Sequence, residues 1–236
     1  GLGPVPDLAG YITSGSDFLI ACDEAVMGDG HTWDFRVKIT GFWHMGTTDD
    51  PLPSEVEAFL EAGPPPVYIG FGSMTARDPV GRTHVLIDAV RLAGVRAILS
   101  AGWADLGVGQ ELPPGCLSIG AVPHAALFPR CVAIVHHGGS GTTAAAARAG
   151  RPQVVVPHLL DQYYFSHRIA VAGLGPRPIP VNTLSAPRLA SAIGQACRDP
   201  SIARRADEVG RKLQVRDGLA EAVDCIAKKS LTLSHS

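Results

Sequence analysis

From Val67 onward, short apolar runs alternate with longer segments of helical pattern along the chain. The apolar runs cover residues 67–71, 95–99, 117–121, 132–135, 154–156 and 178–181, and the helical segments cover 83–93, 142–149, 162–172 and much of 186–227. Short, continuously apolar runs are typical of parallel strands that are covered by helices on both faces. Because strand–helix–strand connections are right-handed, the pattern predicts an α/β fold with a doubly wound, about six-stranded parallel sheet.

The residues before Val67 do not follow this alternation. They hold an apolar stretch at 18–22, a strand-like run at 35–39 and a turn-rich joint at 47–53. Ser54 and Glu57 predict a capping box at the start of a short helix, which Gly63 and three prolines then end. We therefore expect three parts, which are residues 1–64, a sheet domain over 65–228 and a C-terminal tail over 229–236.

Composition excludes several classes of protein. The 236 residues include 20 Lys and Arg against 22 Asp and Glu, so the chain lacks the basic excess of a nucleic-acid-binding protein. With 46% hydrophobic and 18% charged residues, the chain is globular rather than disordered. No uncharged apolar run reaches the ~18 residues of a membrane span, and no signal peptide is recognisable at the N-terminus. The five cysteines are scattered and contain no C-x-x-C pair, which favours reduced thiols and a cytoplasmic location.

The segment with the most chemical information follows the apolar run 132–135. It reads His136-His137-Gly138-Gly139-Ser140-Gly141-Thr142 and leads into an alanine-rich helix. Three glycines leave the first amides of that helix exposed, and a helix N-terminus carries about half a positive charge, so it attracts phosphate. The imidazole of His137 is placed to bond a phosphate oxygen. A lone histidine here would more simply be a buried core group, but its combination with the glycines favours an anion site.

Two further strand ends carry polar groups, and ligands of doubly wound sheets bind at such ends. Gly70-Phe71-Gly72-Ser73 follows the first run, where the glycines allow close backbone approach and Ser73 can donate to an anion. An ordinary tight turn explains this segment equally well. Asp161 and Gln162 follow the run 154–156 and offer hydrogen bonds to sugar hydroxyls, although Asp161 also suits a helix cap. We assign structural roles to His158 and His167.

Two absent motifs and one partial match limit the chemistry. The chain has no P-loop sequence and no Asp-x-Asp pair that would hold a divalent metal on a diphosphate. Residues 139–144 fit the dinucleotide pattern G-x-G-x-x-G/A, with Asp161 twenty residues beyond Gly141. The pattern follows about the fourth strand rather than the first, and Asp161 lies five residues past Val156. An NAD-type oxidoreductase therefore stays open as a weaker alternative.

The chain carries an ordered set of motifs, namely Gly70-Phe71-Gly72-Ser73, Gly102-Trp103, residues 122–128, residues 136–142 and Asp161-Gln162. In this order the motifs resemble the C-terminal, donor-binding half of GT-B family 1 glycosyltransferases, above all sterol glucosyltransferases and bacterial enzymes that glycosylate antibiotics. The resemblance runs from about residue 40 to about residue 224. It implies a Rossmann-like nucleotide-sugar-binding domain over 65–228, preceded in 1–64 by the tail of an N-terminal acceptor domain and a linker.

The same resemblance implies a role for individual residues. The expected diphosphate contacts are Ser73, His137, Gly139, Ser140, Gly141 and Thr142. The backbone of Val122 would read the nucleobase, with Trp103 as an aromatic surface in place of the stacking tryptophan that plant relatives carry where Ala121 stands. Asp161 and Gln162 would hold hydroxyls of the transferred sugar.

The implied activity is that of an inverting, metal-independent hexosyltransferase without a cofactor. Its donor would be a UDP- or TDP-hexose, and its acceptor a lipophilic sterol, polyketide or glycopeptide bound through a missing N-terminal domain. The catalytic base is expected in that domain, so the chain alone is expected to bind donor without transferring sugar. A nucleotide-binding subunit with a separate catalytic partner and an epimerase acting on the sugar nucleotide stay open. The face where the acceptor domain belongs could also pair two copies as a homodimer.

Overall fold

The computed structural model describes residues 18–28, 37–44, 50–74, 78–102 and 112–233. The chain divides into two compact units, one formed by residues 46–214 and one by residues 1–45 together with 215–236. The larger unit starts before the first strand of its sheet, and the last helix belongs to the smaller unit. The expected domain over 65–228 stays a prediction.

The larger unit is built on a five-stranded parallel sheet, which confirms the predicted fold class. The strands are β3 (Val67–Gly70), β4 (Ala97–Ser100), β5 (Cys116–Ile119), β6 (Ala133–His136) and β7 (Gln153–Val155), in the spatial order β5-β4-β3-β6-β7. The chain winds outward from β3 to β5 and then returns to lay β6 on the other side of β3. Gly70 is paired with His136 in this register, so the loops after β3 and β6 leave the sheet side by side. Such a reversal creates a crevice at the carboxyl ends of the strands.

The predicted sixth strand at 178–181 is not formed among the described residues. Two hydrogen bonds tie this segment to the β7 edge, from Ile179 N to Val155 O at 3.0 Å and from Val181 N to Pro157 O at 3.1 Å. Pro178 and Pro180 have no amide hydrogen, so they cannot donate a bond to a strand ladder. The segment then turns into the short helix η3 (Val181–Thr183).

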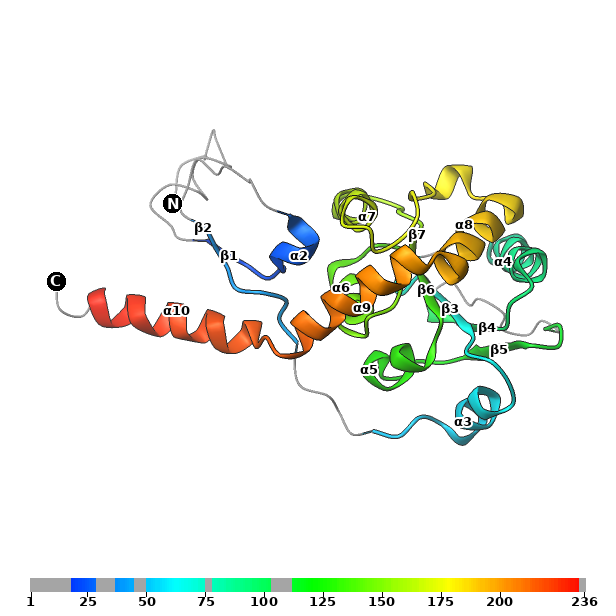
Figure 1. The fold of residues 1–236 in the computed structure, drawn as a ribbon, viewed down its shortest axis with the longest axis horizontal. Coiled ribbons are helices and arrows are strands. Elements are labelled where there is room, and N and C mark those ends of the chain that lie inside the picture. The colour runs from blue at the N-terminus through cyan, green and yellow to red at the C-terminus, as the bar shows by residue number, and fades with distance from the viewer. Residues whose placement is uncertain (1–17, 29–36, 45–49, 75–77, 103–111, 234–236) are drawn as a thin grey trace, which may run out of the picture. The chain divides into compact units, whose positions relative to one another are not determined.

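Helices cover both faces of the sheet (Figure 1). One face packs against α4 (Pro79–Ala93) and α8 (Ala186–Arg198). The other packs against α3 (Ser54–Glu61), α5 (His124–Leu127), η2 (Phe128–Arg130) and α6 (Ser140–Arg148). The helices α7 (Asp161–Val171) and α9 (Pro200–Gln214) complete the unit beside α6. Successive β3 residues alternate between the two cores, with Ile69 in the first and Tyr68 in the second.

The start of α3 differs from the expected capping box. Pro53 is the N-cap residue, Ser54 is already helical, and no side chain bonds the free amides. Glu57 instead pairs with Arg130 at 2.8 Å. The two acidic residues of the first turn, Glu55 and Glu57, still favour the helix through its dipole.

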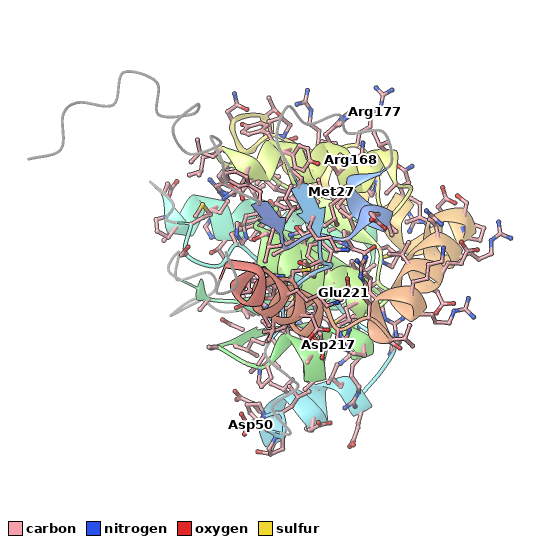
Figure 2. The ribbon with its side chains drawn as sticks, turned by 90° about the vertical axis from the view of Figure 1, so that its left-hand side faces the viewer. Met27, Asp50, Arg168, Arg177, Asp217 and Glu221 are labelled. Atoms are coloured by element: carbon pink, nitrogen blue, oxygen red, sulfur yellow. The ribbon has the colours of Figure 1, made fainter. Side chains whose placement is uncertain are left out.

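The smaller unit contains β1 (Phe18–Ile20), α2 (Glu24–Met27), β2 (Val37–Ile39) and α10 (Gly218–Leu233), with β1 and β2 paired in parallel. Arg216 connects these pieces, since its guanidinium lies 2.9 Å from Asp23 Oδ2 and 2.9 Å from Glu221 Oε1. Hydrogen bonding to Arg216 lowers the pKa of Glu221, which lies on α10 close to Asp217 (Figure 2). Among the described residues, no helix has the length and apolar character needed to cross a membrane.

Candidate functional site

The crevice between β3 and β6 contains the glycine-rich segment predicted to bind phosphate. β6 ends at His136, and α6 begins at Ser140 with Gly139 as its N-cap residue and no side-chain capping bond. The first amides of α6 therefore lack intrahelical partners and are left for an external acceptor. Ser140 and Gly141 are exposed and Thr142 is half-buried, so a ligand can reach this helix start from solvent.

The two adjacent histidines have different surroundings. His136 is completely buried, with Nε2 2.9 Å from Gln153 Oε1 and Nδ1 accepting a 3.1 Å bond from Gly138 N. Burial lowers the pKa of His136 to about 3, so its imidazole is neutral. His136 is thus a core residue whose ring fixes the backbone at Gly138, which has a φ of 93° that favours glycine.

His137 is half-buried, and its Nδ1 atom is buried without a hydrogen-bond partner among the described residues. Two glycines make room for the ring, because a methyl group at Gly139 would lie 2.5 Å from Nε2 and one at Gly72 would lie 3.2 Å from Cε1. Burial lowers the pKa of His137, and the charge of Asp161 opposes this shift. A neutral imidazole with an unused nitrogen stands beside an uncapped helix start, which is a suitable pair of groups for a phosphate oxygen.

A cavity of about 460 Å³ opens at the ends of β3, β4 and β5. The lining residues are Tyr68, Gly70, Gly72, Ser100, Ala101, Gly102, Gly120, Ala121, Val122, His124 and Thr142. Val122, the predicted nucleobase contact, belongs to this lining, whereas Trp103 lies outside the described residues. Thr142 belongs both to the cavity wall and to the first turn of α6, so the cavity adjoins the predicted phosphate site. Ser73 lies three residues after Gly70, the last residue of β3, and its side chain is exposed.

The predicted sugar contacts lie at the start of α7. Asp161 is the first helical residue, is exposed and does not cap the helix, since the N-cap position is Leu160 and makes no side-chain bond. Leu160 has a φ of 44° and a ψ of −124°, a backbone conformation that is costly for any residue other than glycine. This backbone turn leaves the Asp161 carboxylate close enough to His137 to influence its pKa.

Gln162 is only 4% exposed and its side chain is engaged within the protein. Its Oε1 atom accepts bonds from His158 N at 2.8 Å and Leu159 N at 3.2 Å, and its Nε2 atom lies 3.4 Å from Met74 Sδ. The carbonyl end of Gln162 therefore holds the turn before α7. The amide end faces the loop that follows β3.

Two residues near this edge of the sheet carry polar groups that the sequence patterns did not single out, namely Tyr68 and Arg82. The sequence analysis included His124 only as part of the motif 122–128 and gave it no role. His158, predicted to be structural, donates from Nδ1 to Val156 O at 2.9 Å and presents Nε2 to Arg82 Nη1 at 3.4 Å. Burial lowers the pKa of His158 to about 4, so the ring stays neutral beside the guanidinium. The sequence signal for Tyr68 was weak, because a tyrosine in an apolar run is read as core.

Among the described residues, no group of three or more His, Cys, Asp or Glu side chains is arranged to hold a metal ion. The polar groups at the crevice include helix amides, hydroxyls and neutral imidazoles, with the Asp161 carboxylate close to His137. These groups suit an anion bound directly by the protein.

A parallel sheet that reverses at β3 and β6, with an uncapped glycine-rich helix start at the reversal, is a Rossmann-like arrangement. The family described as "Erythromycin biosynthesis protein CIII-like, C-terminal domain" matches residues 95–226. The chain belongs to this family, which confirms the resemblance noted in the sequence.

Two curated relatives and one solved structure illustrate the similarity. The chain is 39% identical to a vancomycin aglycone glucosyltransferase of Amycolatopsis orientalis over 99% of its own length and 56% of the relative's. It is 35% identical to a sterol 3-beta-glucosyltransferase of Arabidopsis thaliana, over 96% of this chain and 36% of that one. The crystal structure of the glycotransferase of kitacinnamycin matches with a TM-score of 0.70 and 27% identity, covering 89% of this chain and 54% of that one. The chain therefore spans about half or less of the length of these proteins.

Proposed function

We propose that this chain is the donor-binding half of an inverting, metal-independent hexosyltransferase. Its ligand is a UDP- or TDP-hexose, with the diphosphate on the start of α6, the nucleoside in the cavity beside β3, β4 and β5, and the sugar next to Asp161. The relatives named above are a vancomycin aglycone glucosyltransferase and a sterol 3-beta-glucosyltransferase. A lipophilic acceptor of this kind is therefore part of the proposal.

One observation carries the proposal more than any other. The Nδ1 atom of His137 is buried and unpartnered among the described residues, and the ring of His137 lies beside Gly139, the N-cap residue of a helix whose first amides have no capping side chain. A buried polar atom without a partner costs about 1–3 kcal/mol, and a bound phosphate oxygen would relieve that cost. The diphosphate is also the leaving group of sugar transfer, so the same contacts would stabilise the charge that develops on it.

Sugar transfer also requires a base that activates the acceptor hydroxyl. The proposal places that base in an N-terminal half, where acceptor contacts are also expected. The chain by itself then binds the donor but does not glycosylate an acceptor. The five cysteines are free thiols, which supports a reducing, cytoplasmic setting for the enzyme.

Calorimetry of this chain against UDP, TDP, UDP-glucose and NAD tests the proposal. We expect binding of at least one of the two nucleoside diphosphates and of UDP-glucose, without added metal and with EDTA present. Selective binding of NAD would favour the oxidoreductase instead. Absence of UDP and TDP binding at millimolar concentration would refute the donor-binding role. An assay for epimerised or hydrolysed UDP-glucose checks whether the chain acts on the sugar nucleotide without an acceptor.

A further inference from the structure

The cavity at the ends of β3, β4 and β5 has a buried phenol in its wall. Tyr68 is 4% exposed, and its hydroxyl oxygen lies 3.4 Å from His124 Nε2. Both residues line the cavity, although 56 positions separate them in the chain. Gly70 provides the space for the phenol, because a methyl group there would lie 2.4 Å from the Tyr68 hydroxyl.

The Tyr68 hydroxyl has two polar neighbours. Burial raises the pKa of Tyr68, and a side-chain hydrogen bond with Ser100 acts against this shift. Tyr68 remains protonated at neutral pH and has one hydrogen to give. His124 Nε2, at 3.4 Å, is one acceptor within reach of this hydrogen.

A hydrogen bond donated by Tyr68 would set the tautomer of His124. Burial lowers the pKa of His124, with a smaller effect of the neighbouring His137, so the ring is neutral. When Nε2 accepts from Tyr68, the single ring proton must be on Nδ1. The ring plane is also held, because His124 stacks on Phe128 with a 4.3 Å centroid distance and a 16° interplanar angle. His124 lines the cavity, and no hydrogen bond of its Nδ1 atom is found among the described residues.

We infer that Tyr68 is a positioning residue for the nucleoside of the donor, acting through His124. The relay runs from Ser100 through Tyr68 to His124, which then donates from Nδ1 to an oxygen of the pyrimidine nucleoside. The inference rests on the proposed function, since it requires the nucleoside to occupy this cavity. It adds a specificity element to the backbone contact at Val122, because a hydrogen-bond donor is presented to an acceptor atom.

Tyr68→Phe tests the inference with little loss of ring packing. We expect affinity for uridine, UMP and UDP to fall by the same factor of about three- to tenfold, which is the range for one neutral hydrogen bond. The matched control is Tyr163→Phe on α7, where the side chain is 45% exposed and outside the cavity lining. This control should leave all three affinities unchanged.

Two further measurements separate positioning from a purely structural role. Nitrogen-15 NMR of the ligand-free chain should show His124 mainly as the Nδ1–H tautomer, with a shift toward Nε2–H in Tyr68→Phe. In a His124→Ala background, Tyr68→Phe should cause no additional loss of uridine affinity. Unchanged affinity and an unchanged tautomer in Tyr68→Phe would overturn the inference, as would fully additive losses in the double variant.

The same data distinguish this inference from the proposed function. If the wild-type chain binds neither UDP nor uridine, the proposed function fails and the inference fails with it. If the wild type binds UDP, His137→Ala weakens that binding and Tyr68→Phe does not, the inference alone is wrong.

Discussion

Replacing His137 by alanine is the most direct perturbation of the proposed phosphate site. The substitution removes an imidazole that has no hydrogen-bond partner for Nδ1 among the described residues. A bond from an imidazole to a charged phosphate oxygen is worth about 1–3 kcal/mol. UDP affinity should therefore fall by about 5- to 150-fold. Uridine lacks the diphosphate, so its affinity should change little.

The variant should fold almost as well as the wild type, because His137 is half-buried and contributes no internal bond through Nδ1. Calorimetric titration with UDP and uridine tests the predicted loss of affinity, and a thermal melt tests the predicted stability of the variant. His167→Ala is the matched control, since His167 is exposed on α7. Equal loss of UDP and uridine affinity, or a large fall in melting temperature, would show that His137 has a structural role.

The pH dependence of binding gives an independent readout of the same contact. Burial holds the pKa of His137 below its usual value in the free protein. A bound diphosphate favours the protonated ring, so binding raises this pKa and takes up a proton. UDP affinity should therefore rise as the pH falls from 8 toward 6, more steeply in the wild type than in His137→Ala. Parallel pH profiles would contradict this contact.

Three other outcomes follow from the structure. His136→Ala should lower the free energy of unfolding by about 3–5 kcal/mol in urea titrations, because it opens a cavity and strands the Gln153 carbonyl. In the wild type, His136 has a pKa of about 3 in the folded protein against about 6.5 in the unfolded chain. The free energy of unfolding should therefore decline as the pH falls from 6.5 toward 3, by at most about 1.4 kcal/mol per pH unit. A free energy of unfolding that stays constant over that range would contradict this prediction. Asp161→Asn should weaken UDP-glucose but not UDP, and equal weakening would mean that Asp161 does not contact the sugar.

The strand and helix pattern was predictable because it depends on local chemistry. The central strand β3 is buried on both faces, as Tyr68 with 4% and Ile69 with 0% exposure illustrate. The failure at 178–181 has an equally local cause that the pattern overlooked, since Pro178 and Pro180 remove two of the donors that a strand needs. The pairing of Arg216 with Asp23 could not be predicted, because 193 positions separate the two residues in the chain.

The site was predictable only in part. Glycines 138, 139 and 141 mark a strand-to-helix turn in any context, and the turn is where the sequence placed it. The sequence did not show that Gln162 would bond the backbone of His158 and Leu159, because that contact depends on the turn at Leu160. The contacts of Ser73 and Asp161 with a donor remain predictions.

By itself, the sequence determined which segments form strands and where the glycine-rich helix start lies, because backbone sterics and apolar periodicity act between near neighbours. Only the tertiary structure decided which of the two imidazoles is sealed in the core and which keeps an unused nitrogen at the crevice. It also brought Tyr68 to His124 across 56 residues. Such pairings follow from the order of strands in the sheet, which places residues from different connections at one edge.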